Sequence, residues 1–218
     1  MIKLIIFDLD GTLVNAYPAV VRSVNHALTQ LGFPKRSPTE IKRSVGGGDR
    51  HLMAHFIGEE FADKAIRLYR PHHTKALAAP GGVRFLPGAL KLLRDLKSRG
   101  YKIAIASNRP TKFTLIILDV LGARSLFDTV LCADKAVHPK PYPDMLWAVI
   151  KNLKVTKSQT IYVGDMTIDI ETGQRAGIKT VAVATGSSSM KELKDLKPWR
   201  ILGRISLLKT LINTQEIS

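Results

Sequence analysis

Cysteine is almost absent from the sequence, and long apolar runs are absent altogether. The single cysteine among the 218 residues, Cys132, can form neither an intramolecular disulfide nor a cysteine-rich zinc site. Wholly apolar runs are short, such as Leu4 to Phe7, whereas a membrane-spanning helix needs about 20 apolar residues. Asp8 and Asp10 interrupt the first apolar run before a secretory signal is complete. We therefore expect a cytoplasmic protein that does not cross a membrane.

Acidic residues and aromatic residues are also scarce. The chain has 18 acidic against 33 basic residues, a formal net charge of +15, and 6% aromatic residues. A basic excess is compatible with a nucleic-acid partner, so a basic nucleic-acid-binding protein stays open as an alternative of another class. The basic residues are nevertheless spread over the whole chain, with no basic run interleaved with aromatics. We therefore expect a general surface charge and no specific nucleic-acid partner.

What the sequence does have is an alternation of strand-like and helix-like segments. Hydrophobic residues make up 45% of the chain, enough for a buried core, and the length suits one domain with an insert. Short apolar runs that predict strands buried on both faces recur at Ile2 to Phe7, Lys102 to Ala106, Thr129 to Cys132, Thr160 to Val163 and Lys179 to Ala184. Helical spacing separates the later runs, and an edge strand at Trp199 to Leu202 and a helix at Ser206 to Ile212 follow. This alternation predicts an α/β fold with a Rossmann-like parallel sheet.

Residues 15–82 break the alternation because they carry helical patterns only. Ser37 to Glu40 reads as a capping box with proline at the first helical position, which predicts a helix start. A glycine run at 46–48 precedes two further helical stretches, Arg50 to Ile57 and Glu59 to Leu77. Turn-forming residues at 79–82 then return the chain to the sheet. We therefore expect a Rossmann-like core of residues 1–14 and 83–218, and an inserted, all-helical cap domain of residues 15–82.

Polar residues follow four of the predicted strands where each strand ends. Asp8 and Asp10 follow the first strand and, two residues apart, point to the same side of an extended segment. Ser107-Asn108 follows the second strand, Lys140-Pro141 lies beyond the third, and Gly164 to Asp169 follows the fourth. The carboxyl ends of parallel strands meet at one edge of a sheet, which is where ligands bind. The sequence therefore predicts one polar site assembled from all four segments.

The same four segments resemble the motifs of the haloacid dehalogenase-like superfamily of phosphotransferases. Asp8 to Thr12 matches the D-x-D-G-T motif, Ser107 the second motif, Lys140 the third, and Gly164 to Asp169 the G-D-x-x-x-D motif. The match runs in order over nearly the whole chain. The helical insert is similar to the small cap of the phosphoglycolate phosphatase-like branch.

The resemblance implies a role for each matching residue. Asp8 would be the nucleophile that forms an aspartyl-phosphate, and Asp10 the general acid and then the general base. Mg²⁺ would be held by Asp8, by the Asp10 backbone carbonyl and by Asp165, with Asp169 supporting them. The phosphoryl group would be held by Lys140, Ser107, Thr12 and Asn108.

The resemblance implies a Mg²⁺-dependent phosphatase for a small phosphorylated metabolite, with 2-phosphoglycolate as a candidate substrate. Inorganic pyrophosphatase activity stays open, because Asn15 resembles the variant found in some pyrophosphatase-like members. Dehalogenation is disfavoured because it needs no second acid, and Asp10 is present. In the glycine-rich segment of the cap, Arg50 is a candidate partner for a carboxylate or a second phosphate of the substrate.

Overall fold

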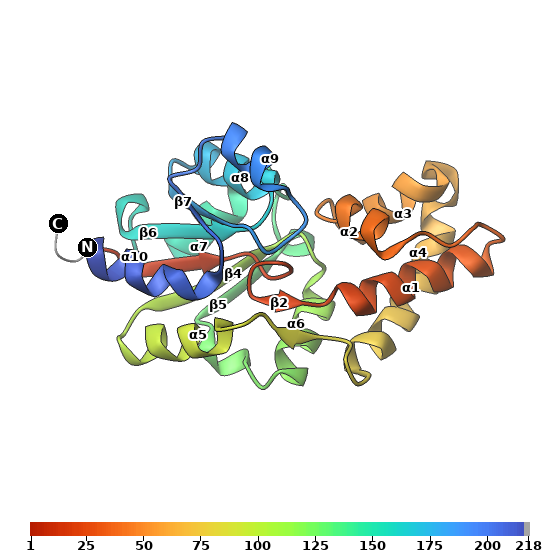
Figure 1. Cartoon of the computed structure of the whole chain (residues 1–218), viewed down its shortest axis with the longest axis horizontal. Coiled ribbons are helices and arrows are strands. Elements are labelled where there is room, and N and C mark those ends of the chain that lie inside the picture. The colour runs from red at the N-terminus through yellow and green to blue at the C-terminus, as the bar shows by residue number, and fades with distance from the viewer. Residues whose placement is uncertain (216–218) are drawn as a thin grey trace.

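Six parallel strands form the sheet at the centre of the larger lobe (Figure 1). The computed structural model describes residues 1–215. In spatial order the strands are β5 (Thr129–Cys132), β4 (Lys102–Ser107), β1 (Leu4–Phe7), β6 (Thr160–Gly164), β7 (Lys179–Val183) and β8 (Arg200–Leu202). The chain thus runs outward on one side of β1 and then returns to fill the other side, the doubly wound order of Rossmann-type folds. This confirms the predicted α/β class.

Helices cover both faces of the sheet because side chains alternate along each strand. Leu4 and Ile6 pack in one apolar layer, while Ile5 and Phe7 pack in the other, and all four are fully buried. The first layer is covered by α7 (Asp144–Asn152) and α8 (Thr167–Ala176), with α9 (Met190–Asp195) beside α8; the second is covered by α5 (Ala89–Ser98), α6 (Thr111–Val120) and α10 (Leu208–Gln215). Burying one such aliphatic side chain contributes about 1.5–3 kcal/mol, which explains why the strands have no polar face.

Several ends differ from the sequence-based predictions by one or two residues. The first strand begins at Leu4, although the Lys3 amide still donates to Gln159 O at 2.8 Å and the Lys3 carbonyl accepts from the Lys102 amide at 2.9 Å. The predicted last helix opens with a 3₁₀ turn at Ile205–Leu207 before α10. Further 3₁₀ turns lie at Arg124–Leu126, Ala133–Lys135 and Lys157–Gln159.

The strand register brings the polar segments to one level. Phe7, the last residue of β1, lies opposite Ile105 of β4 and Val163 of β6. Asp8 therefore follows one residue beyond that level, and Ser107 and Asp165 two residues beyond it. β1 and β6 flank the point where the strand order reverses, which is the usual ligand position in such sheets.

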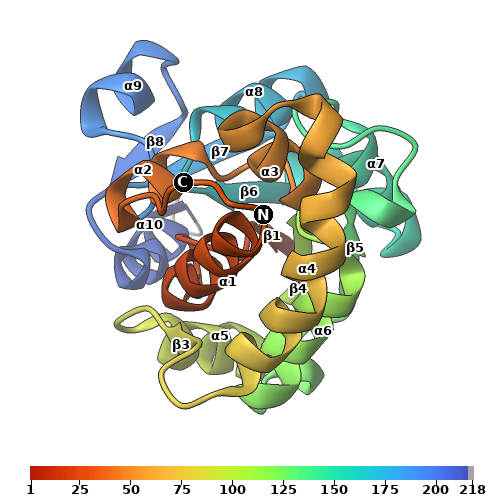
Figure 2. The ribbon, with the colours of Figure 1, turned by 90° about the vertical axis from the view of Figure 1, so that its right-hand side faces the viewer.

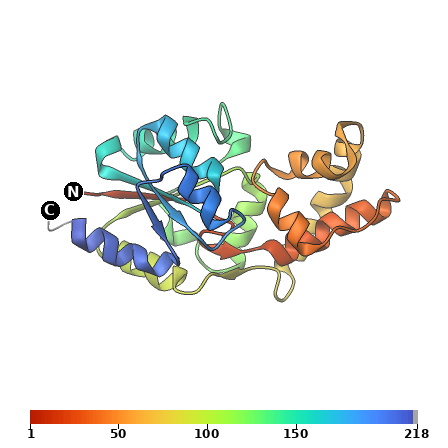
Figure 3. The ribbon, with the colours of Figure 1, turned by 45° about the horizontal axis from the view of Figure 1, so that its top comes forward.

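Four helices form a second lobe at the same end of the sheet, opposite the chain termini (Figures 1 and 3). They are α1 (Tyr17–Gln30), α2 (Pro38–Ser44), α3 (Asp49–Ile57) and α4 (Glu59–Ala78). The capping box at the start of α2 is present, because Ser37 Oγ accepts from the Glu40 amide and the Glu40 carboxylate accepts from the Ser37 amide. The inserted helical cap is thus observed as predicted. Viewed from this end, its helices stand in front of the sheet (Figure 2).

A short antiparallel ribbon joins the cap to the core. Its strands are β2 (Val14–Asn15) and β3 (Arg84–Phe85), which pair where the chain enters the cap and where it leaves it. The proposed domain boundaries, after residue 14 and before residue 83, fall at this ribbon. The cap also contacts the core directly through an ion pair of 2.7 Å between Arg43 of α2 and Glu192 of α9. Among the described helices, none is both long and apolar enough to cross a membrane.

Candidate functional site

The first motif forms a tight turn at the end of β1. The Asp8 amide donates to Val163 O at 2.8 Å, which continues the sheet by one residue. The chain then reverses, and the Gly11 amide donates to Val14 O at 2.8 Å. Gly11 has φ of +81°, a conformation that favours glycine. The turn therefore presents Asp8 and Asp10 at the carboxyl edge of the sheet.

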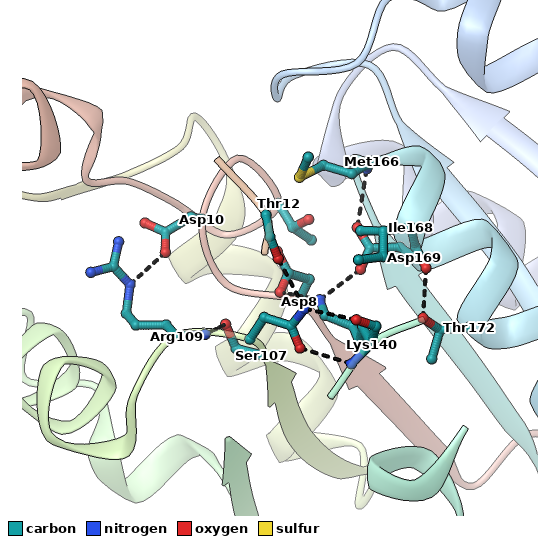
Figure 4. A network of polar contacts seen from close by, with 12 residues as sticks. Asp8, Asp10, Thr12, Ser107, Arg109, Lys140, Met166, Ile168, Asp169 and Thr172 are labelled. Atoms are coloured by element: carbon teal, nitrogen blue, oxygen red, sulfur yellow. Dashed lines mark hydrogen bonds and ion pairs between the residues drawn. The ribbon is translucent and has the colours of Figure 1, made fainter. Parts of the chain in front are cut away.

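Lys140 lies between two carboxylates (Figure 4). Its Nζ is 2.7 Å from Asp8 Oδ1 and 2.7 Å from Asp169 Oδ1, and all three side chains are buried. Burial alone would lower the pKa of Lys140, but Asp169 and Asp8 outweigh it and raise that pKa well above its usual range. Lys140 is therefore an ammonium ion that fixes one oxygen of Asp8.

Asp169 supports this arrangement from behind. Its Oδ1 accepts from Lys140 and, at 2.6 Å, from the Tyr162 hydroxyl. Its Oδ2 accepts from the backbone amides of Asp165 and Met166, at 3.1 and 3.0 Å. A carboxylate has about four acceptor sites, and all of them are used. Asp169 is therefore placed to orient Lys140 and the Asp165 loop and has no lone pair left for a cation.

Asp165 is a further acid of the site and is fully buried. Its oxygens accept from Thr12 Oγ1 at 2.8 Å and from the Ser187 amide at 3.2 Å, which leaves one acceptor site on each. A Cβ atom added at Gly11 or Gly186 would come within 2.5 or 1.5 Å of Asp165 Oδ2. The two glycines thus make the space that this carboxylate occupies.

The site holds more negative than positive charge. One oxygen each from Asp8, Asp165 and Asp169 lie within 4.8 Å of one another, and Lys140 is the cation that contacts two of them. Burial raises the pKa of Asp8 to about 6, although Lys140 opposes the shift. Burial, Asp8 and Asp169 raise the pKa of Asp165 well above its usual range. Three carboxylates and one ammonium leave two negative charges, which a divalent cation would balance.

Two buried hydroxyls next to Asp165 also fit a hydrated cation. Apart from each other, Tyr17 Oη and Ser187 Oγ have no hydrogen-bond partner in the part of the chain that the structure describes. Burial and the nearby acids, Asp165 first, raise the pKa of Tyr17, so its hydroxyl stays protonated. Mg²⁺ keeps several of its waters when bound, and such waters would satisfy hydroxyls of this kind. The residues present therefore fit a divalent cation held chiefly by Asp8 and Asp165.

The second motif places Ser107 and Asn108 at the end of β4. Ser107 Oγ accepts from the Arg109 amide at 3.3 Å, which leaves its own proton for another partner. The Asn108 side chain accepts from the Lys140 amide at 2.9 Å and donates to Gly46 O at 2.9 Å. Asn108 thus connects the Lys140 loop to the glycine-rich segment of the cap. Both residues line the same cavity as Asp8 and Lys140.

Arg109 is a site residue that the sequence analysis missed. Its Nε donates to Asp10 Oδ2 at 2.6 Å, and its Nη1 lies 2.8 Å from His73 Nε2 of the cap helix α4. The Asp10 side chain is therefore turned toward Arg109 and away from the acidic cluster (Figure 4). The sequence feature that could have identified Arg109 is its position directly after the Ser107-Asn108 motif.

A cavity lies between the core and the cap and is lined by residues of both. Its polar wall includes Asp8, Asp10, Ser107, Arg109 and Lys140. Much of the remaining wall is apolar and comes from both lobes, namely Val20, Val45, Leu52, Phe113, Met166 and Ile168. Ligand sites have this composition, a mostly apolar wall with a few converging polar groups.

Two predicted phosphate or substrate contacts take other positions. Thr12 is fully buried and donates to Asp165, so its hydroxyl holds an acid in place and does not line the cavity. Arg50 points to the exposed face of the cap, where it pairs with Glu59 at 2.6 Å and Asp63 at 2.9 Å. Two exposed carboxylates one turn apart attract its guanidinium away from the site. The glycine-rich segment does reach the cavity, through Gly46, Gly48 and Asp49.

Comparison with known proteins agrees with this geometry. The family model described as "Haloacid dehalogenase-like hydrolase" matches residues 5–183. The chain belongs to the haloacid dehalogenase-like hydrolases. It is 29% identical over 184 residues to a phosphoglycolate phosphatase of Aquifex aeolicus, covering 84% of this chain and 85% of that protein. It is 30% identical over 215 residues to a phosphoglycolate phosphatase of Psychrobacter arcticus, with 94% of each covered.

A solved structure supports the same branch of the haloacid dehalogenase-like hydrolases. The crystal structure titled "a predicted phosphoglycolate phosphatase" from Haemophilus somnus 129PT superposes with a TM-score of 0.89. It is 26% identical in sequence, and the match covers 97% of this chain and 98% of that one. The chain is therefore a phosphatase of this family, and its substrate is a small phosphorylated compound.

Proposed function

We propose that the protein is a Mg²⁺-dependent phosphatase that hydrolyses a small phosphorylated metabolite through an aspartyl-phosphate on Asp8. The observation that carries the proposal is the meeting of Asp8, Ser107 and Lys140 on the wall of one cavity, with Asp10 beside them. A nucleophile, two groups for phosphoryl oxygens and a separate acid are the parts that phosphoryl transfer through a covalent intermediate requires.

In the first step a carboxylate oxygen of Asp8 attacks phosphorus, and the bond between phosphorus and the ester oxygen breaks. Asp10 gives its proton to the departing ester oxygen, which leaves as an alcohol. In the second step Asp10 removes a proton from water, and the resulting attack on phosphorus releases phosphate and restores Asp8. Asp10 suits both steps because its Oδ1 is buried without a partner in the described residues.

The charge that develops on the phosphoryl oxygens needs donors already in place. The Lys140 ammonium contacts Asp8, so it lies next to the phosphoryl group that Asp8 would carry. The Ser107 hydroxyl proton is available for a second oxygen, because Oγ accepts from the Arg109 amide. Asp8 and Asp165 would hold Mg²⁺, with Asp169 behind them. The bound ion would supply charge neutralisation between Asp8 and the incoming phosphate.

We take 2-phosphoglycolate as the first substrate to test. Support comes from the names of the similar proteins, several of which are phosphoglycolate phosphatases. Arg109 is a cation on the cavity wall, beside Asp10, where a substrate carboxylate would find a partner. We keep the cytoplasm as the compartment, since Cys132 is a buried free thiol.

Phosphate release from a panel of compounds tests the proposal. The panel contains 2-phosphoglycolate, pyrophosphate, sugar phosphates and nucleotides, each assayed with Mg²⁺ and with EDTA. We expect Mg²⁺-dependent release that is abolished in Asp8→Asn, a variant of nearly the same size and shape. Release in EDTA equal to that in Mg²⁺, or full activity of Asp8→Asn, would refute the mechanism. A preference for pyrophosphate would overturn the substrate assignment alone.

A further inference from the structure

A chain of polar contacts runs from the proposed general acid into the cap. Arg109, which follows β4 of the core, donates through Nε to Asp10 Oδ2 and places Nη1 at 2.8 Å from His73 Nε2. His73 belongs to α4 of the cap and is completely buried. The guanidinium thus connects the two lobes, and one of its two partners is the residue that transfers the proton.

The hydrogen bonds around His73 fix its tautomer. Ser23 Oγ is 2.7 Å from Ala19 O, a carbonyl that only accepts, so the single hydroxyl proton is used there. Ser23 Oγ therefore accepts from His73 Nδ1, 3.1 Å away, and Nδ1 carries the ring proton. Nε2 then has a free lone pair and accepts from Arg109. Burial, assisted by the positive charge of Arg109, lowers the pKa of His73 to about 2, so the ring stays neutral.

Two aromatic rings hold the imidazole in this orientation. Tyr69 of α4 stacks on it with centroids 4.8 Å apart and an interplanar angle of 21°. Phe113 of the core helix α6 meets it edge-on, with centroids 4.9 Å apart. The acceptor that the cap offers to Arg109 is therefore rigid, and it is present only when α4 lies against α6.

The two oxygens of Asp10 differ in their surroundings. Oδ2 is occupied by Arg109, while Oδ1 has no hydrogen-bond partner among the described residues, and Asp10 lines the cavity. Oδ2 can accept from Arg109 whether or not Oδ1 carries a proton. Because Arg109 holds Oδ2, it determines where Oδ1 points in both proton-transfer steps.

We infer that Arg109 and His73 are positioning residues for Asp10. When the cap is packed against the core, His73 holds Arg109, and Arg109 in turn orients Asp10 for proton transfer to the leaving group. The inference rests on the proposed function. His73 does not line the cavity, so it acts through Arg109. The step itself is unchanged: as the P–O bond breaks, the proton moves from Asp10 Oδ1 to the ester oxygen and the phosphoryl group moves to Asp8.

The test compares two leaving groups in the full-length protein. The value of kcat/KM reports events up to phosphorylation of Asp8, the first irreversible step. An alkoxide leaves poorly without a proton, whereas 4-nitrophenolate leaves readily without one. In His73→Leu, which removes the acceptor, we expect kcat/KM to fall at least about tenfold for the best alkyl phosphate of the panel, a fraction of the 10²–10⁴-fold that general acids provide. For 4-nitrophenyl phosphate we expect a fall below about threefold.

The ratio of the two kcat/KM values separates positioning from structural damage. Partial unfolding or loss of active enzyme lowers both values by the same factor and leaves the ratio unchanged. His73→Gln, whose side-chain carbonyl can accept from Arg109, should restore most of the ratio. His72→Leu is the matched control, because His72 neighbours His73 and also contacts Ser23, but the structure gives it no contact with Arg109.

Three outcomes count against the inference. Equal losses on both esters in His73→Leu, or no loss on either, would overturn the positioning role while the phosphatase activity stands. A ratio change in His72→Leu as large as that in His73→Leu would also overturn it, since the effect would then not pass through Arg109. Failure of the wild type to hydrolyse any ester would instead refute the proposed function, and this role with it.

Discussion

Replacing Lys140 by methionine should destabilise the protein strongly when no divalent cation is present. The side chain is 4% exposed, and its Nζ contacts Asp8 and Asp169, which are 9% and 1% exposed, at 2.7 Å each. Methionine has a similar length but leaves two buried carboxylates without their shared counter-ion. Breaking a buried ion pair by removing one partner costs about 3–5 kcal/mol. At roughly 2–4 °C per kcal/mol for a chain of this size, Tm should fall by about 6–20 °C.

Urea denaturation and thermal unfolding in EDTA measure this loss. The control is Lys209→Met, the same change at a pair with Asp95 of 2.6 Å whose side chains are 49% and 25% exposed, where we expect less than about 1 kcal/mol. Mg²⁺ should raise Tm more in Lys140→Met than in the wild type, because the site then has one more uncompensated negative charge. A loss in EDTA below about 1 kcal/mol, equal to the control, would refute the charge balance that we assign to the site.

Other predictions concern stability and the contact between the cap and the core. His73 has a folded pKa of about 2, so between that value and the unfolded value near 6.5 only the unfolded state binds its proton. The contribution of His73 to the free energy of unfolding should therefore fall by about 1.4 kcal/mol per pH unit as pH drops below about 6.5. Urea titrations at several pH values should show a shallower slope in His73→Gln, and parallel curves would contradict the assignment. In Gly173→Ala the new Cβ would lie 1.7 Å from Thr180 Oγ1, so we expect a loss of about 1–3 kcal/mol in urea denaturation. Arg43→Gln removes the exposed pair with Glu192 between cap and core and should raise KM less than about fivefold at low ionic strength. High salt should abolish that difference, and a difference that persists in high salt would show that the effect does not come from the charge of the Arg43–Glu192 pair.

The strands of the core were predictable because their signal is local. A parallel strand buried on both faces needs an apolar run, and each run that the sequence offers is a strand of the sheet. The ribbon of β2 and β3 had no such signal, since each strand has two residues. It exists because Val14 pairs with Phe85 and Asn15 with Arg84, partners about 70 residues apart whose pairing depends on the cap between them.

The acids of the site were predictable for a related reason. Their place after a strand end, together with the rule that parallel strands end at one edge, is enough to bring Asp8 and Asp165 together. The hydrogen-bond partner of each side chain was not predictable. Thr12 lies in the same motif as Asp8 yet donates to Asp165, because the turn at Gly11 directs its hydroxyl inward, next to β6.

The two arginines show where local reasoning ends. Arg50 follows a glycine-rich segment, but a long flexible cation pairs with the carboxylates within its reach, and those are Glu59 at 2.6 Å and Asp63 at 2.9 Å on the neighbouring helix. Among the described residues, the acid that pairs with Arg109 is Asp10, whose side chain is 19% exposed. The Arg109 side chain is 10% exposed, and burying a guanidinium requires partners that only the folded protein supplies, Asp10 from the core and a neutral imidazole from the cap. A buried cation between two lobes is therefore a feature that only the packing of the cap against the core creates, since its partners Asp10 and His73 come one from each lobe.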